Sequence, residues 1–191
     1  MNKEKNKIFI ISGPSGVGKT SVAKGVLKKL PDLKTSVSYT TRTKRLGKRE
    51  DKVMIHVSEN DFRKKIAAGD FLEWAIVHDN FYGTDKKTVE KYLKENSLLM
   101  NIDVQGALQI KEKMPDKTVL IFIKAENFKE LIRRIKQREK IPQAILNLRL
   151  KNARKELKLA KKYDYTVINK KGRLKEAVRD VGEIIRKKMQ G

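Results

Sequence analysis

The residues with the clearest chemistry form one glycine-rich stretch near the start of the chain. Residues 13–20 match G-x-x-x-x-G-K-[ST], the pattern of a phosphate-binding loop. In such a loop, backbone N–H groups surround phosphate oxygens, the lysine reaches the β- and γ-phosphates, and the threonine hydroxyl ligates Mg²⁺. We therefore predict a site for ATP and its Mg²⁺ ion, with Thr20 as the metal ligand. Its residues are Gly13, Pro14, Ser15, Gly16, Val17, Gly18, Lys19 and Thr20.

The segments on either side of this loop have the patterns of a buried strand and a helix. The apolar run Ile8–Ile11 stands directly before it. After it, apolar residues recur at helical spacing over Lys19–Leu30. This strand–loop–helix context distinguishes a phosphate-binding loop from a chance match, because the N-terminus of the helix presents its positive end to the same anion.

The composition is that of a soluble globular protein with one sizeable core. Of 191 residues, 39% are hydrophobic and 36% are charged. The lack of cysteine excludes disulfides and thiolate metal sites, and two histidines are too few for a histidine-built metal site. No apolar stretch approaches the length of a membrane span, and the first residues lack the apolar core of a signal peptide. We therefore expect a cytoplasmic protein without a membrane partner.

The formal net charge of +23 raises the question of a nucleic-acid partner. The lysines and arginines are spread along the whole chain and are mixed with acidic residues on helical faces. The sequence contains no recognition-helix motif, no zinc-finger spacing and no aromatic-rich RNA-binding motif. We therefore expect mostly solvated surface charge and no specific nucleic-acid binding, and the sequence identifies no protein partner.

Apolar runs suited to buried strands alternate with helical patterns, which is typical of an α/β fold with a mainly parallel sheet. The runs assigned to this sheet are Ile8–Ile11, Val37–Thr40, Leu98–Ile102, Val119–Ile123 and Thr166–Ile168. The predicted helices are Lys19–Leu30, Val104–Lys113, Asn127–Arg138, Gln143–Lys161 and Leu174–Met189. With the loop, this order predicts a P-loop NTPase-type core with helices on both faces of the sheet.

The pattern changes between residues 42 and 95, where a small α+β lobe is predicted as an insertion. Residues 53–57 and 71–77 read as strands, and Ser58 precedes a helix between them.

A second irregular segment, Glu139–Ala144, contains Pro142 and separates two helices that carry arginines. It indicates the hinge of a helical lid, whose first helix has a capping-box pattern at Asn127 and Glu130. We expect one domain over residues 1–191. Its parts are a core of about 1–35, 96–126 and 162–191, an inserted lobe of about 36–95, and a lid of about 127–161.

Four further motifs follow the loop in order. They are Ser36-Val37-Ser38-Tyr39-Thr40-Thr41-Arg42-Thr43-Lys44-Arg45, Glu73-Trp74-Ala75, Asn80-Phe81-Tyr82-Gly83-Thr84 and Asn101-Ile102-Asp103-Val104-Gln105-Gly106. Over about residues 7 to 170, this ordered set closely resembles guanylate kinase, a family of P-loop nucleoside monophosphate kinases. The resemblance implies the reaction ATP + GMP ⇌ ADP + GDP, by in-line phosphoryl transfer with Mg²⁺, with dGMP as a further acceptor.

The resemblance also implies roles for individual residues on the GMP side. Arg42, Arg45 and Tyr82 would hold the GMP phosphate, and Asp103 would also lie in the GMP site. Ser38, Glu73 and Thr84 would read the guanine. A carboxylate suits that task, because guanine offers adjacent N1–H and N2–H₂ donors, whereas adenine has a bare N1 acceptor.

On the ATP side, the resemblance implies three lid arginines that close on the phosphates. They are Arg134, Arg138 and Arg149, and with Lys19, Arg42 and Arg45 they form the expected catalytic set. Asn169 would lie beside the adenine ring. Arg133 and Arg154 have no counterpart in the family pattern, so we expect them to be solvated.

The chain departs from the family pattern at three positions. Lys48 stands where a glutamate is usual, Met54 replaces a tyrosine, and Asn101 replaces the first aspartate of D-I-D. A tyrosine can donate a hydrogen bond to a charged phosphate, worth about 1.5–3 kcal/mol, and methionine cannot. We therefore expect weaker GMP binding or altered Mg²⁺ handling, with Lys48, Arg49 and Lys52 as other possible phosphate ligands.

Three other functions remain open from the sequence. One is a guanylate-kinase-like binding module with weak or no catalysis, which the intact loop disfavours. Another is a P-loop kinase for a different nucleoside monophosphate, which the changes at Met54 and Asn101 favour. The third is nucleic-acid binding through net charge.

Overall fold

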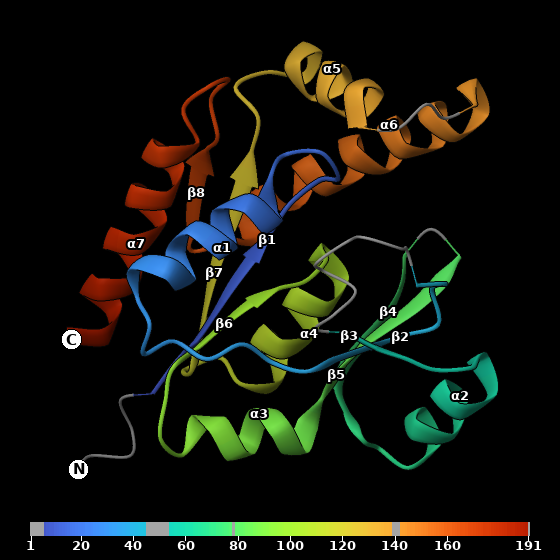
Figure 1. The fold of residues 1–191 in the computed structure, drawn as a ribbon, viewed down its shortest axis with the longest axis vertical. Coiled ribbons are helices and arrows are strands. Elements are labelled where there is room, and N and C mark those ends of the chain that lie inside the picture. The colour runs from blue at the N-terminus through green and yellow to red at the C-terminus, as the bar shows by residue number, and fades with distance from the viewer. Residues whose placement is uncertain (1–5, 45–53, 78, 139–141, 191) are drawn as a thin grey trace.

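A four-stranded parallel sheet carries the phosphate-binding loop (Figure 1). The computed structural model describes residues 6–44, 54–77, 79–138 and 142–190. The strands stand in the order β6 (Leu98–Asn101), β1 (Ile8–Ser12), β7 (Thr118–Lys124) and β8 (Tyr165–Ile168), all parallel. Both faces of this sheet are covered, which explains why its strands read as nearly continuous apolar runs.

Alternate residues of β1 enter two separate hydrophobic clusters. Phe9 and Ile11 pack with α1 (Lys19–Lys29) and α7 (Leu174–Gln190) on one face. Ile8 and Ile10 pack with α3 (Lys86–Leu93) and α4 (Val104–Lys113) on the other. This period of two follows from strand geometry. The predicted class, a P-loop NTPase-type α/β core with helices on both faces, is confirmed.

A second sheet stands beside the first, with the order β3 (Met54–His56), β2 (Ser38–Thr40), β5 (Asn80–Asp85) and β4 (Phe71–Val77). The pair β2–β3 is parallel and the other two pairs are antiparallel. Helix α2 (Glu59–Ala67) covers its outer face through the buried ring of Phe62. Ser58 caps this helix as predicted, because its hydroxyl accepts the N–H of Asp61 at 3.1 Å.

The assignment of residues 37–40 to the large sheet was wrong. These residues form β2 of the second sheet, and among the described residues a single isolated bridge, between Lys34 and Leu98, joins the preceding segment to the large sheet. The physical reason lies in the alternation of polar Ser38 and Thr40 with aromatic Tyr39. Such alternation suits a sheet with two chemically different faces, whereas strands buried on both faces read as apolar throughout.

Two helices, α5 (Phe128–Arg138) and α6 (Gln143–Lys158), lie beyond the carboxyl ends of the parallel strands (Figure 1). The predicted helix over residues 143–161 ends in a separate 3₁₀ turn, η2 (Leu159–Lys162). Leu131 and Ile135 of α5 and Leu146 of α6 are buried in the same cluster as α1. Among the described residues, no helix combines the length and the apolar character that crossing a membrane requires.

Helix α3 was not expected from the sequence. It has only eight residues, about two turns, of which Val89 and Leu93 are buried, so its apolar pattern is short. Asp85 starts the helix by accepting the N–H of Thr88 at 2.6 Å.

Candidate active site

The loop between β1 and α1 needs glycine for two different reasons. Gly13 has a φ of 137°, and a Cβ there would collide with the carbonyl oxygen of Ile123 in β7. Gly18 precedes α1 with a φ of 93°, in the left-handed region that glycine adopts readily. A Cβ on Gly18 would also meet the side-chain amide of Asn169, so the loop, β7 and the end of β8 are in close contact.

Lys19 and Thr20 stand in the first turn of α1. The Lys19 ammonium group donates to the carbonyl oxygens of Gly13 at 2.5 Å and Pro14 at 3.0 Å. The Thr20 hydroxyl accepts a hydrogen bond from the side-chain amide of Asn101 at 3.2 Å. The substituted Asn101 therefore lies directly beside the predicted magnesium ligand.

The three predicted guanine-reading residues form one row across the second sheet. Ser38 of β2 lies opposite Thr84 of β5, and Thr84 lies opposite Glu73 of β4. Directly opposite residues of antiparallel strands share a face. The Thr84 hydroxyl donates to a carboxylate oxygen of Glu73 at 2.6 Å, and both side chains are buried.

A β-bulge in β4 turns Glu73 toward this face. Phe71 lies opposite Asp85, whereas Glu73 lies opposite Thr84, so Leu72 is an extra residue. Since Asp85 and Thr84 point to opposite faces, Phe71 and Glu73 do so as well, although residues two apart normally share a face. The bulge keeps Phe71 in the aromatic cluster under α2 while Glu73 faces the site.

Glu73 is only 4% exposed. Burial raises the pKa of this carboxyl to about 7, because the charged form loses solvation; the nearby charge of Asp103 also raises it, and the Thr84 hydrogen bond and Lys113 lower it. Burial raises the pKa of Asp103 too, although its bond from the Gly106 N–H at 2.7 Å favours the charged form. Two carboxylates thus stand close together at the start of α4.

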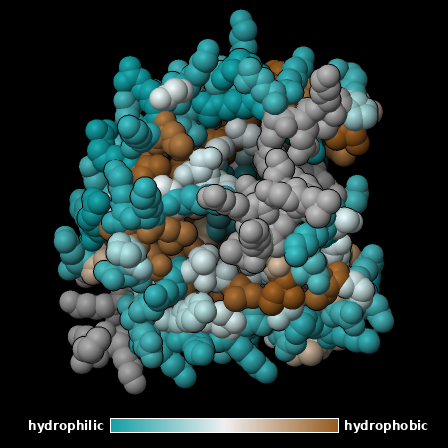
Figure 2. Space-filling view, in the orientation of Figure 1, coloured by the Kyte–Doolittle hydropathy of each residue, from teal (hydrophilic) through white to brown (hydrophobic). Residues whose placement is uncertain are grey.

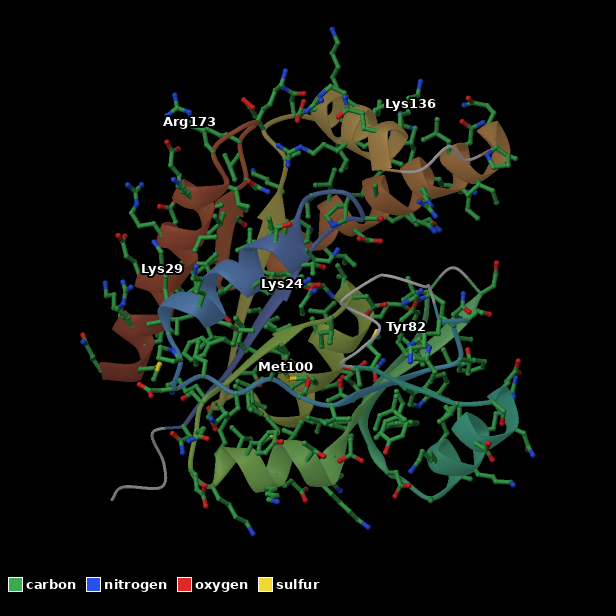
Figure 3. The ribbon with its side chains drawn as sticks, viewed as in Figure 1. Lys24, Lys29, Tyr82, Met100, Lys136 and Arg173 are labelled. Atoms are coloured by element: carbon green, nitrogen blue, oxygen red, sulfur yellow. The ribbon has the colours of Figure 1, made fainter. Side chains whose placement is uncertain are left out.

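The predicted phosphate-binding residues follow the same face. Tyr82, labelled in Figure 3, lies opposite Thr40 and two residues from Thr84, so by register it shares a face with the row of Ser38, Thr84 and Glu73. Arg42 follows β2, and its N–H donates to the Thr40 hydroxyl at 3.1 Å. The Arg42 carbonyl accepts from Nδ1 of His56 at 2.7 Å, which holds this turn against β3. Arg45 lies outside the described residues.

Helix α5 places Arg134 against the phosphate-binding loop. Its guanidinium pairs with Glu130 at 2.7 Å and donates to the carbonyl oxygens of Asn169 at 2.9 Å and Val17 at 3.4 Å. The Asn169 side-chain amide also donates to the Val17 carbonyl, at 2.8 Å. The structure thus brings together Arg134, Asn169 and the loop, as expected from the sequence.

The remaining predicted lid residues make fewer described contacts with the loop than Arg134 does. Arg149 is half-buried on α6, and the side chain of Arg138 and the hinge residues 139–141 lie outside the described part of the chain. Asn127 accepts the Glu130 N–H at 2.8 Å, so the predicted cap forms, but the Glu130 carboxylate binds Arg133 and Arg134 instead of completing a capping box. Those two guanidinium groups hold the pKa of Glu130 at about 2.

A cavity of about 260 Å³ opens beside Arg134 and Asn169. Its lining includes Gly18, Ser21, Arg133, Lys170 and Lys171. Arg133 was expected to be solvated, and its side chain is 38% exposed; it also pairs with Glu130 at 2.7 Å and lines the cavity. Its spacing of three residues from Glu130 was the available signal. Arg154 is exposed, but its guanidinium stacks 4.9 Å above the Phe128 ring.

The turn from β6 to α4 joins the two halves of the site. Asn101 contacts Thr20 beside the phosphate-binding loop, and Gly106 contacts the carboxylate of Glu73. Five residues span at most about 18 Å when fully extended. The predicted triphosphate site and the predicted guanine site therefore lie within one short segment of each other.

The comparisons agree with this geometry. The sequence model of the guanylate kinase family matches residues 5–188. The guanylate kinase of Thermotoga maritima is 41% identical over 183 residues, 95% of this chain and 87% of the relative. That of Caldanaerobacter subterraneus is 44% identical over 168 residues, 87% of this chain and 81% of the relative.

Among solved structures, a crystal structure of guanylate kinase from Anaplasma phagocytophilum superposes with a TM-score of 0.80 at 32% identity. The match covers 97% of this chain and 87% of that one. From the loop, the guanine row and these relatives together, the chain belongs to the guanylate kinase family.

Proposed function

We propose that this protein is an active ATP:GMP phosphotransferase, which transfers the γ-phosphoryl group of ATP to GMP and, by the same chemistry, to dGMP. The observation that carries the proposal is the β6–α4 turn. It contacts the predicted magnesium ligand Thr20 at one end and the buried Glu73 at the other. A donor and an acceptor nucleotide bound at these two places would meet between them.

On the donor side, the loop residues Gly13–Thr20 bind the ATP phosphates. Backbone N–H groups surround the anion, and Lys19 exchanges its bonds to the Gly13 and Pro14 carbonyls for phosphate oxygens. Arg134 and Asn169 border the cavity beside Gly18, which suits the nucleoside part of ATP. Arg134, Arg138 and Arg149 supply positive charge that neutralises the negative charge on the transferred phosphoryl group.

On the acceptor side, Glu73 accepts the N1–H and N2–H₂ donors of guanine, with Thr84 and Ser38 beside it. Adenine would place its bare N1 lone pair against the same carboxylate. Sites built around such a hydrogen-bonding requirement reject the wrong partner by roughly 10⁴-fold or more. Arg42, Arg45 and Tyr82 hold the GMP phosphate in line with ATP, and Asp103 borders the acceptor.

The residues around Thr20 fit Mg²⁺ that is held mostly by the nucleotide. The hydroxyl of Thr20 stands at the start of α1, and among the described residues no cluster of three acidic or histidine side chains forms a separate metal site. Magnesium ions in kinase sites take one or two protein oxygens and complete their shell with phosphates and waters. When bound, the ion neutralises charge on the phosphates that are exchanged.

Positioning and charge neutralisation account for most of the catalysis of phosphoryl transfer. We assign the core to about residues 1–35, 96–126 and 162–191, the GMP lobe to 36–95 and the lid to 127–161. Closure of lobe and lid on the core would exclude water from the transfer path. Helix α5 is already docked on the loop through Arg134.

A coupled assay for ADP release, run with GMP, dGMP, AMP, UMP and CMP, tests the proposal. We expect turnover with GMP and dGMP and little with the others, and Lys19→Ala is the inactive control. Turnover with another monophosphate in preference to GMP would show a different nucleotide kinase. No ADP with any acceptor, together with retained GMP binding, would show a binding module.

A further inference from the structure

Helix α4 contains a glycine whose missing side chain leaves space for Glu73. A Cβ placed on Gly106 would overlap Oε2 of Glu73 and lie 2.8 Å from its carboxyl carbon. The next nearest atom, Oδ1 of Asp103, would be 3.4 Å away, an ordinary contact. Glu73 is therefore the one neighbour of Gly106, among the described residues, that a methyl group would displace.

The backbone gives no other reason for glycine at this position. Gly106 lies in the first turn of α4 and its φ is not positive. Glycine is among the least favoured residues in helices, so a helical glycine without a special φ needs a packing reason.

Glu73 cannot easily move aside. Its carboxylate is buried and is held by the Thr84 hydroxyl at 2.6 Å, and its backbone is fixed by the bulge in β4. A methyl group on residue 106 would have to push the carboxylate away from Thr84 or push α4 away from β4. Either movement would change where the carboxylate meets a bound base.

We propose that Gly106 is a specificity-determining, positioning residue, whose lack of a side chain sets the place of the Glu73 carboxylate that reads guanine. The inference rests on the proposed GMP activity for its functional part and on packing alone for its structural part. Gly106 would act through its contact with Glu73.

The packing part is tested by thermal unfolding of Gly106→Ala in two backgrounds. In the wild-type background the substitution should lower the melting temperature. In a Glu73→Ala background the obstacle is absent, so the same substitution should leave the temperature unchanged or raise it. Equal destabilisation in both backgrounds would overturn the inference, and a Gly106→Ala protein that folds only with Glu73→Ala would support it.

Gly182→Ala is the matched control for this experiment. Gly182 is also a buried helical glycine without a positive φ, and the nearest atom to its added Cβ is 3.9 Å away. This substitution should raise the melting temperature by about 1–4 °C and leave the kinetics unchanged.

The functional part is tested by kinetics with GMP and IMP, since IMP lacks the 2-amino group of guanine. Gly106→Ala should lower kcat/KM for GMP by about 10- to 100-fold, reduce the preference for GMP over IMP, and leave the KM for ATP unchanged. Glu73→Asp withdraws the carboxylate by one C–C bond, about 1.5 Å. It should reduce GMP activity in the wild type but raise it in Gly106→Ala.

Additive effects of Gly106→Ala and Glu73→Asp, or an unchanged GMP/IMP ratio, would overturn the inference. These results are distinct from failure of the proposed function, which would appear as a wild-type protein that does not phosphorylate GMP. In that case the unfolding experiment still decides whether Gly106 positions Glu73.

Discussion

At the scale of single residues, the proposed GMP site depends on a carboxylate whose burial disfavours its charged form. Glu73 is buried beside Asp103, its hydroxyl partner is neutral, and Lys113 offsets only part of the cost of its charge. Burial that raises the pKa of Glu73 to about 7 places its titration inside the range in which the protein would work. In the proposed role Glu73 must be charged to accept both guanine donors, and a pKa of about 7 would leave it half-protonated near neutral pH in the free protein.

We predict that kcat/KM for GMP falls about tenfold per pH unit below about 7, because protonated Glu73 loses an acceptor. The protonated carboxyl gains one O–H donor, which suits the N1 acceptor of adenine, so discrimination against AMP should also decline. Rate–pH profiles with GMP and AMP measure both effects. Glu73→Gln should lack this acidic limb, and an unchanged limb in that variant would show that another group titrates.

The same pKa has a consequence for stability, with a defined sign. Between pH 4.5 and about 7 the folded state binds a proton on Glu73 that the unfolded state has lost. Stability relative to Glu73→Gln should therefore be higher at low pH and decline as pH rises through this window, by up to about 3 kcal/mol. Unfolding of both proteins by denaturant at pH 5 and pH 8 measures the difference.

Met54, one of the departures from the family pattern, lies in the second sheet beside the predicted guanine-reading residues. It lies opposite Ser38 in β3, on the face that carries the guanine row and Tyr82. We predict that Met54→Tyr lowers the KM for GMP by about tenfold or more, since a phenol can donate to the charged phosphate. The KM for ATP should not change. A GMP KM equal to that of the wild type would show that the side chain at 54 does not reach the phosphate.

At the scale of elements, helix α4 completes the hydrogen bonding of the edge strand β4. The Gln109 amide donates to the Trp74 carbonyl at 2.9 Å and accepts the Trp74 N–H at 3.3 Å, and Lys113 donates to the Leu72 carbonyl at 2.6 Å. Four helical residues rise about 6.0 Å, and two strand residues span about 6.7 Å. Gln109 and Lys113, four residues apart on α4, therefore reach backbone groups that lie two residues apart on β4. The helix thus covers an otherwise open sheet edge next to Glu73.

We predict that Gln109→Ala destabilises the protein by about 1–2 kcal/mol, because the backbone N–H and C=O of Trp74 both lose their partner. It should also raise the KM for GMP several-fold through the neighbouring Glu73, while the KM for ATP stays the same. Gln143→Ala is the control, since Gln143 bonds only the exposed Asn147 of its own helix among the described residues. Wild-type stability and GMP affinity in Gln109→Ala would show that α4 does not hold this strand.

What the sequence could predict depends on how far apart the interacting residues are. Strand β1 and its loop were predictable because an apolar run and eight consecutive residues carry the signal. Glu73 was found through the family resemblance, but its bulge and its contact with Gly106 depend on the register between distant segments. Strand β2 was assigned to the wrong sheet because three residues of alternating polarity do not specify their partner.

At the scale of the whole molecule, the net charge of +23 opposes folding and favours the binding of phosphate-bearing ligands. Hydrophilic residues cover most of the face in Figure 2, and basic side chains such as Lys29, Lys136 and Arg173 extend outward in Figure 3. Repulsion among like charges destabilises the compact state, while the same field attracts phosphates. Both effects weaken when salt screens the charges.

We therefore predict opposite responses to salt. Raising KCl from about 0.1 M to about 1 M shortens the Debye length from about 10 Å to about 3 Å. The melting temperature should rise because self-repulsion is screened, whereas the KM values for ATP and GMP should increase because attraction to their phosphates is screened. Adenosine binding, which involves no phosphate, is the control and should change little. A melting temperature that falls with KCl would show that attractive ion pairs, such as Arg134–Glu130, outweigh the excess of positive charge.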